Sequence, residues 1–255
     1  MVFAIPRTRF GWRLFHLFMT LALIFLIYKL IKYPMSKNQI EIVQPKVIEK
    51  TVERKPIIHE VTDDGDVSAP VLITVYYEAL CPDSKSFVTK QLLPAYEKGA
   101  RIMDVDLVPY GKATTKIIDD RYEFECQHSY EECEANKVHA CVIYYIPKTL
   151  ERIRYVSCMI QSSSKPIQAG HDCAKQLYID YHPIKHCAQS EKGSELLKKH
   201  GDQTQAVRPK ITFIPTVTVD NSSDISSLPA LLKDLFGEVC KQFKDIQPNE
   251  CLDRD

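Results

Sequence analysis

The sequence has no cysteine before position 81 and no excess of either charge. Lysine and arginine together number 33, and so do aspartate and glutamate. This balance gives no field that would attract a polyanion, so we expect no nucleic-acid partner. Glycines number only eight, and no phosphate-binding glycine loop, Ser/His/Asp arrangement or carboxylate pair stands out. The sequence therefore predicts no cofactor and no resident metal.

All nine cysteines lie between residues 81 and 251. An odd number of them is expected if eight pair and one stays free. Paired thiols require an oxidising compartment, outside the cytosol. Proximity favours a bridge between Cys240 and Cys251, and the other pairings stay open. The nine are Cys81, Cys126, Cys133, Cys141, Cys158, Cys173, Cys187, Cys240 and Cys251.

The N-terminus is apolar after a short basic segment, residues 1–13. Residues 14–31 read "LFHLFMTLALIFLIYKLI", at the short end of what spans a bilayer. The following residues lack a small-residue cleavage site, so we expect an uncleaved signal anchor and keep a cleaved signal peptide as the alternative. The cysteines then place the rest in the lumen of the secretory or endolysosomal pathway, as a single-pass type II membrane protein or a secreted one. Residues 32–70, with mixed charges and prolines, predict a stalk.

The folded domain is predicted at 71–255. Residues 71–78, "VLITVYYE", predict a buried strand, 82–98 a helix kinked at Pro94, and 103–111 a second strand, which together make a βαβ unit. Residues 119–189 hold six cysteines and short helical patterns, with no strand pattern. A helix near 190–201, a strand pair around Pro215 and one closing amphipathic helix at 225–246 follow. We expect an α/β, thioredoxin-like fold with a disulfide-rich helical insertion at about 119–189.

Cys81 stands where the first strand meets the first helix, in "YYEALCPDSKSF". Only a thiolate attacks a disulfide. A helix N-terminus stabilises a negative charge by roughly 0.3–2 kcal/mol, although the neighbouring Asp83 works against this. Ser84, three residues on, cannot displace a bound sulfur as a second cysteine would. Cys81 alone would form a mixed disulfide that needs another thiol to resolve it.

Pro215 begins the strand in "FIPTV". In a thioredoxin-like fold such a proline is cis and lies against the reactive sulfur, where it exposes the backbone of Ile214 to an extended substrate. The sequence alone states less, because a proline at a strand start is usually trans. We take Ile214 and Pro215 as candidate substrate-binding residues.

The segment "CQHSYEECEANKVHAC", residues 126–141, resembles the signature C-Q-H-G-x2-E-C-x2-N-x4-C of the gamma-interferon-inducible lysosomal thiol reductase (GILT) family, and the resemblance extends over about 71–252. Ser129 replaces the signature glycine. The resemblance implies a thioredoxin-like fold, reduction of protein disulfides at acidic pH and a lysosomal or secreted location. It also implies a C-x-x-C site, which here becomes Cys81 as the attacking thiol and Ser84 in the resolving position, so the chain resembles a divergent member of the family. The matching residues are Cys126, Gln127, His128, Glu132, Cys133, Asn136 and Cys141.

Two functions follow as alternatives. In the first, the protein is a thiol-disulfide oxidoreductase that acts on disulfide-containing protein substrates through one cysteine, as a reductase or isomerase supported by a small-molecule thiol. In the second, it is a redox-inactive, thioredoxin-like binding module in the lumen. A purely structural lumenal anchor is a weaker third.

Several residues have competing interpretations. Zinc bound by Cys126, Cys133 and Cys141 with His128 and His139 is disfavoured, because the spacing lacks the paired C-x2-4-C of structural zinc sites. His128 and Glu132 either assist proton transfer or fix the insertion by hydrogen bonds. Asn221 begins "NSS", a glycosylation sequon. The remaining histidines of the domain, His171, His182, His186 and His200, are expected on the surface.

Overall fold

The computed structural model describes residues 16, 18–25, 28–29, 69–162, 165–222, 225–244 and 247–252. Contacts divide the chain into two units, Met1–Thr62 and Asp63–Asp255. The described residues of the first unit are helical, with exposed apolar side chains such as Leu23 and Ile24. Within the described stretches, no helix is long and apolar enough to cross a membrane. The basic segment 1–13 and nearly all of the stalk lie outside them, and the membrane segment at 14–31 stays a prediction.

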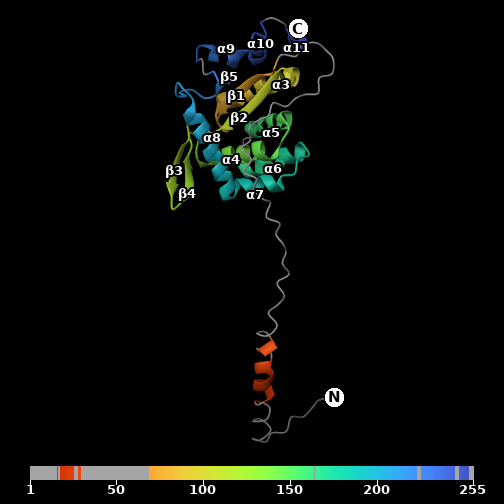
Figure 1. The fold of residues 1–255 in the computed structure, drawn as a ribbon, viewed down its shortest axis with the longest axis vertical. Helices are drawn as coiled ribbons and strands as arrows, with labels where there is room; N and C mark the ends of the chain where they lie inside the picture. Colours follow the sequence, from red (N-terminus) through yellow and green to blue (C-terminus); the bar gives the residue numbers. More distant parts are fainter. Residues whose placement is uncertain are drawn as a thin grey trace. The chain divides into compact units, whose positions relative to one another are not determined.

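The second unit is built on a three-stranded sheet of order β2-β1-β5 (Figure 1). Strand β1 (Val71–Tyr77) runs parallel to β2 (Met103–Pro109) and antiparallel to β5 (Thr216–Val219). The β-branched and aromatic run of β1 is almost wholly buried, as expected for a central strand covered on both faces. The predicted βαβ unit is confirmed.

The crossover between β1 and β2 is a continuous helical segment of three parts. Helix α2 (Pro82–Phe87) leads into the π-helical segment η1 (Val88–Leu92) and then into α3 (Leu93–Gly99). Pro94 has no N–H to donate to a preceding carbonyl, and a local π-helical turn accommodates the missing bond. The irregularity therefore lies just before the proline at which we expect a kink.

The segment after β2 begins with a β-hairpin. Strand β3 (Thr114–Ile118) pairs with β4 (Arg121–Glu125) through a turn at Asp119 and Asp120, both of positive φ. The expectation that 119–189 contains no strand is therefore wrong at β4. Its side chains alternate between half-buried aromatics and exposed charged groups, the period of a strand.

Helices make up the rest of the insertion. They are α4 (Tyr130–Tyr145), α5 (Thr149–Gln161), α6 (Pro166–Gln176) and α7 (His182–Ala188), and α8 (Glu191–Ala206) follows them. These helices share a core of their own that includes Val138, Val142 and Tyr155. The predicted helical character is confirmed from residue 130 onward.

The C-terminal part differs from the prediction in two places. Only β5 forms where a strand pair around Pro215 is predicted, because proline cannot donate to a ladder and the preceding Ile211 and Ile214 pack beside Cys81 instead. The single closing helix is divided at Asp234, whose carboxylate accepts a hydrogen bond from the N–H of Gly237 at 2.9 Å and so caps a new helix. The elements are η2 (Ile225–Ser227), α9 (Leu228–Lys233), α10 (Leu235–Cys240) and α11 (Asn249–Leu252).

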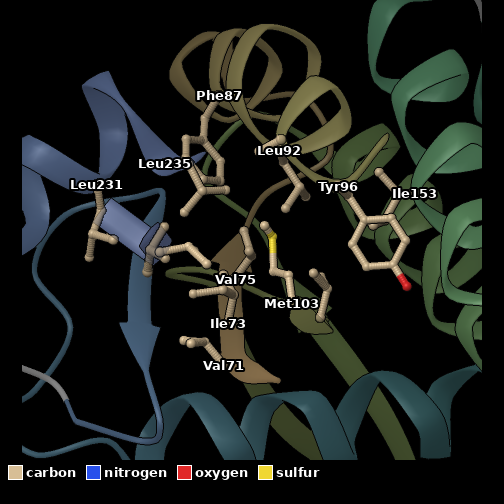
Figure 2. Close-up of a cluster of buried hydrophobic side chains, with 14 of the residues drawn as sticks. Val71, Ile73, Val75, Phe87, Leu92, Tyr96, Met103, Ile153, Leu231 and Leu235 are labelled. Carbon is tan, nitrogen blue, oxygen red and sulfur yellow. The ribbon is translucent and has the colours of Figure 1, made fainter. Parts of the chain in front are cut away.

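The main core covers one face of the sheet. Figure 2 shows side chains of β1 and β2 meeting side chains from the crossover helix, α5, α9 and α10. Ile73 and Val75 have no exposed surface, and neither do Leu92 and Leu235. This packing fixes the end of β1, and therefore the position of the residues that follow it. The labelled residues are Val71, Ile73, Val75, Phe87, Leu92, Tyr96, Met103, Ile153, Leu231 and Leu235.

Candidate redox site around Cys81

Cys81 is the free cysteine of the chain. The other eight form the bridges Cys126–Cys133, Cys141–Cys187, Cys158–Cys173 and Cys240–Cys251. Four pairs and one free thiol agree with the odd count, and the predicted Cys240–Cys251 bridge is confirmed. Because Cys126, Cys133 and Cys141 are in bridges, they are not thiolate ligands for the disfavoured zinc site.

The sulfur of Cys81 lies at the N-terminus of α2. Cys81 is the N-cap residue, with extended backbone angles, and its carbonyl accepts the N–H of Lys85 at 2.9 Å. The side chain is 7% exposed and packs among Tyr76, Val108 and Ile214. The thiol is thus a nearly covered group at a helix end.

The backbone of Ile214 faces this sulfur. The Cys81 Sγ lies 3.9 Å from the Ile214 carbonyl oxygen, and the Ile214–Pro215 peptide bond is cis. The arrangement is the one expected for a thioredoxin-like fold. Leu80 and Phe213, which precede Cys81 and Ile214 in sequence, are 36% and 44% exposed. Apolar side chains therefore stand at the surface on both segments that meet at the sulfur.

Ser84 is fully buried one helical turn after Cys81. Its Oγ accepts a hydrogen bond from the N–H of Glu78 at 3.3 Å, which ties the first turn of α2 to the end of β1. Ser84 therefore holds the local structure, and its hydroxyl has no sulfur to exchange.

Glu78 is a buried acid beside the sulfur, with 1% of its surface exposed. Its Oε1 accepts the N–H of Lys112 at 2.7 Å, whereas Oε2 accepts no hydrogen bond and lies 3.4 Å from Nδ1 of His128. Burial raises the pKa of Glu78, and the nearby Glu132 carboxylate adds to this, while the Lys112 N–H and His128 oppose it.

The segment 126–141 supplies the histidine of this cluster. His128 Nδ1 lies 2.7 Å from Oε2 of the fully buried Glu132, and the backbone N–H of His128 donates to Glu132 Oε1 at 3.1 Å. One donor atom each from Glu78, Cys81 and His128 lie within 4.8 Å of one another. His128 and Glu132 therefore hydrogen-bond to each other beside the Cys81 sulfur, a position that is compatible with both the proton-transfer and the structural interpretation.

Other residues of this segment hold it against β1. The Oδ1 of buried Asn136 accepts the N–H of Ala79 at 3.0 Å, two residues before Cys81. His139, one turn further along α4, lies 3.1 Å from the hydroxyl of Tyr77. Burial lowers the pKa of His139 to about 3, so it stays neutral. Gln127 is exposed at the turn before α4.

Glu78 is the site residue that the sequence analysis misses. Its signal is an acid at the end of a buried apolar run, three residues before Cys81, where burial without a partner would be costly. Asn221, the predicted glycosylation site, is exposed in the turn after β5; its modification stays a prediction. A hollow of about 520 Å³ lies elsewhere, between α5 and α6, and contains none of the residues around Cys81.

A βαβ unit, a strand entered through a cis proline and a free cysteine capping the first helix define the thioredoxin-like class of thiol-disulfide oxidoreductases. The model of the gamma interferon inducible lysosomal thiol reductase family matches residues 72–177. A thiol reductase-like protein of this name from Anopheles gambiae is 34% identical, over 77% of this chain and 85% of its own length. GILT-like protein 1 of Drosophila melanogaster is 31% identical, over 72% and 79%. The chain belongs to the GILT family.

The chain also matches solved structures of low sequence identity. The crystal structure of Chlamydia trachomatis DsbA is 18% identical, with a TM-score of 0.48, and the match covers 71% of this chain and 92% of that one.

Proposed function

We propose that the protein is a thiol-disulfide oxidoreductase that works through one nucleophile, Cys81, and depends on a second thiol from outside the protein. The observation that carries the proposal is the free Cys81 sulfur at the start of α2, 3.9 Å from the carbonyl of Ile214. Its substrates would be protein disulfides in extended segments, which displace the Cys81 contact at the buried Ile214 to pair with the backbone before Pro215, and which rest on the exposed Leu80 and Phe213.

Reduction proceeds in three exchange steps. The Cys81 thiolate attacks one sulfur of a substrate disulfide, a new S–S bond joins enzyme and substrate, and the other substrate sulfur leaves as a thiolate that takes up a proton. A small-molecule thiolate then attacks the Cys81 sulfur and releases the second substrate sulfur as a thiolate, and a second small-molecule thiolate frees Cys81 and leaves as part of a small-molecule disulfide. If a different thiolate of the substrate attacks its sulfur in the mixed disulfide instead, a new substrate disulfide forms and Cys81 is released, so the outcome is isomerisation with no net reduction.

The disulfides also indicate the cellular compartment of the protein. Four bridges in the folded unit belong in an oxidising lumen, and the Anopheles gambiae relative described above is named a lysosomal thiol reductase-like protein. We therefore assign the folded unit to the secretory or endolysosomal lumen. The apolar segment at 14–31 would anchor it there as a type II membrane protein, or be removed to give a secreted one.

One observation favours the second function. Cys81 is only 7% exposed and Ser84 offers no resolving thiol. Binding of extended peptides beside Pro215 requires neither an accessible thiol nor a resolving one, so a binding module without redox turnover also fits this site.

The deciding experiment measures reduction of a disulfide-linked model peptide by purified protein, with and without a small thiol, under acidic and neutral conditions. The wild type should reduce it only with the added thiol, and Cys81→Ala should not exceed background. Ser84→Cys should gain thiol-independent first turnover, because the new sulfur can displace the substrate. Ser157→Cys, at a buried serine on α5, controls for an added thiol and should behave as wild type.

Trapping gives a second readout. Without a resolving cysteine, the wild type should accumulate a substrate-linked species that Cys81→Ala lacks and Ser84→Cys releases. Equal background in all variants, with peptide still bound, would establish the binding module instead.

A further inference from the structure

Beside Cys81, the structure brings together the atoms of a metal site. Glu78 Oε2, Cys81 Sγ and His128 Nδ1 lie within 4.8 Å of one another, and Glu132 Oε2 lies 2.7 Å from the same Nδ1. Carboxylate oxygen, thiolate sulfur and imidazole nitrogen are the ligands that zinc uses in proteins. Three different chain segments supply them: the end of β1, the start of α2 and the turn before α4.

An independent feature points to a bound cation. The Oε2 atom of Glu78 is fully buried and accepts no hydrogen bond. Burying a carboxylate oxygen away from water without a hydrogen-bond donor costs free energy, so such an atom is expected to have a donor or a cation beside it. It is directed at His128 Nδ1, 3.4 Å away, so a cation between the two would give it that partner.

The spacing agrees with tetrahedral zinc. Bonds of about 2.0 Å to oxygen and nitrogen and about 2.3 Å to sulfur place neighbouring ligand atoms roughly 3.3–3.6 Å apart. The Glu78–His128 separation of 3.4 Å already has this value, and Cys81 Sγ, which lies within 4.8 Å of both atoms, would have to approach them by up to about 1.2 Å. Glu132 Oε2 lies 2.7 Å from Nδ1, closer than two ligand atoms of one zinc ion, and outside the set of atoms within 4.8 Å of one another, so it would have to move to become the fourth ligand.

We propose that reduced Cys81 binds Zn²⁺ together with Glu78 and His128, with Glu132 as the fourth ligand. The thiol binds as a thiolate and its proton leaves to solvent, as does any proton on the ligating nitrogen. His128, 30% exposed, marks the entry path, because the other three side chains are buried.

Zinc on this sulfur would have a consequence for exchange chemistry, a point that rests on the proposed function. A sulfur lone pair committed to the metal is less available to attack a disulfide. Zinc is then a reversible inhibitor, and the free metal level of the compartment sets the fraction of active protein.

The test uses Co²⁺ as a spectroscopic probe on reduced full-length protein, followed by Zn²⁺ competition. The wild type should bind one Co²⁺ with a thiolate-to-cobalt charge-transfer band and intense tetrahedral bands. Cys81→Ala should lose the charge-transfer band. Glu78→Gln and His128→Asn should weaken binding at least about tenfold. His171→Asn is the matched control, since His171 also lies beside a carboxylate, 3.2 Å from Asp172, but on the exposed surface; it should bind as wild type does.

Two results would overturn the metal site. One is no one-to-one binding in reduced wild type. The other is a charge-transfer band of unchanged affinity in both Glu78→Gln and His128→Asn, which would mean capture by the thiol alone. Circular dichroism of each variant confirms that it is folded.

The metal site and the proposed function fail separately. Peptide reduction measured in the presence of a chelator reports on the function alone. Reduction that zinc does not inhibit, with no cobalt spectrum, removes the metal site and keeps the enzyme. A cobalt spectrum in a protein without reductase activity does the reverse.

Discussion

Gly111 lies directly against the side chain of Glu78. Its φ is +59°, and a β-carbon built on it would overlap Glu78 Cγ and Oε1. The next residue, Lys112, donates its N–H to the same Oε1 at 2.7 Å. The turn after β2 therefore closes over the buried acid, and only a residue without a side chain fits there.

We expect Gly111→Ala to destabilise the protein by about 2–4 kcal/mol, because an unfavourable left-handed backbone and overpacking each contribute about 1–3 kcal/mol. Denaturant unfolding of wild type and variant measures the difference. A double-mutant cycle with Glu78→Ala separates the two causes: part of the cost should disappear when the Glu78 side chain is removed. Strictly additive effects would show that the overlap with Glu78 contributes nothing.

The sequence predicts the core of this fold well, because the elements that carry it have strong local patterns. The β-branched run of β1, the helix from Pro82 to Gly99 and strand β2 all appear within a few residues of their predicted bounds. The predictions are wrong for elements whose sequence pattern is weak or is compatible with more than one structure. Strand β4 has only five residues, and the closing helix is divided by a capping interaction of Asp234 that periodicity does not reveal.

The sequence predicts only those site residues whose type and position along the chain indicate their role. Cys81, Ser84 and Pro215 follow from spacing and strand–helix order. Glu78 does not, because its role comes from contacts with residues 34 and 50 positions away in sequence, Lys112 and His128. His200, expected on the surface, is only 8% exposed; tertiary packing of α8 decides this, and one histidine in a polar helix gives no sign of it.

Ser129 stands where the GILT signature has glycine, and its backbone shows what glycine provides. Its φ is +95° and ψ 176°, a region that is essentially restricted to glycine. We expect Ser129→Gly to stabilise the protein by about 1–2 kcal/mol, since the strain relieved exceeds the added chain entropy. Thermal and denaturant unfolding provide the measurement.

The control for this change is Asp120→Gly. Asp120 also has positive φ, at +58°, but in the left-handed region that aspartate tolerates. Its gain should be clearly smaller. If the two substitutions have equal effects, the Ser129 backbone is not specifically strained.

Asn136 connects the family signature to the segment before Cys81. Its Oδ1 is the acceptor for the buried N–H of Ala79. Asn136→Ala should cost about 1–3 kcal/mol, the cost of leaving a buried donor unsatisfied. Hydrogen exchange at the Ala79 amide should accelerate as well, which a general loss of packing in α4 would not localise there. Gln168→Ala, at an exposed amide on α6, should change stability by less than about 0.5 kcal/mol. An unchanged Ala79 amide would contradict this connection.

Two buried histidines make the stability depend on pH. Burial lowers the pKa of His139 to about 3 and that of His200 to about 4. At His200, the hydrogen bond between His200 and Gln203 opposes this lowering, whereas the charge of Lys199 adds to it. Unfolding returns each to a histidine pKa near 6.5. Between the folded and unfolded values the unfolded state holds more protons, so the free energy of unfolding falls as pH decreases below about 6.5.

At pH about 5 each histidine should cost about 2 kcal/mol relative to pH about 7.5, at 1.36 kcal/mol per unit of pKa difference. His200→Gln retains a polar group near Gln203 but does not titrate, so its loss of stability between these two pH values should be smaller than that of wild type by about this amount. His139→Gln should behave alike. His171→Gln, at an exposed position, should preserve the wild-type dependence. Parallel curves for all four proteins would mean that neither buried histidine is held neutral by the fold, whereas flattening in the two buried variants alone locates the acid sensitivity in α4 and α8.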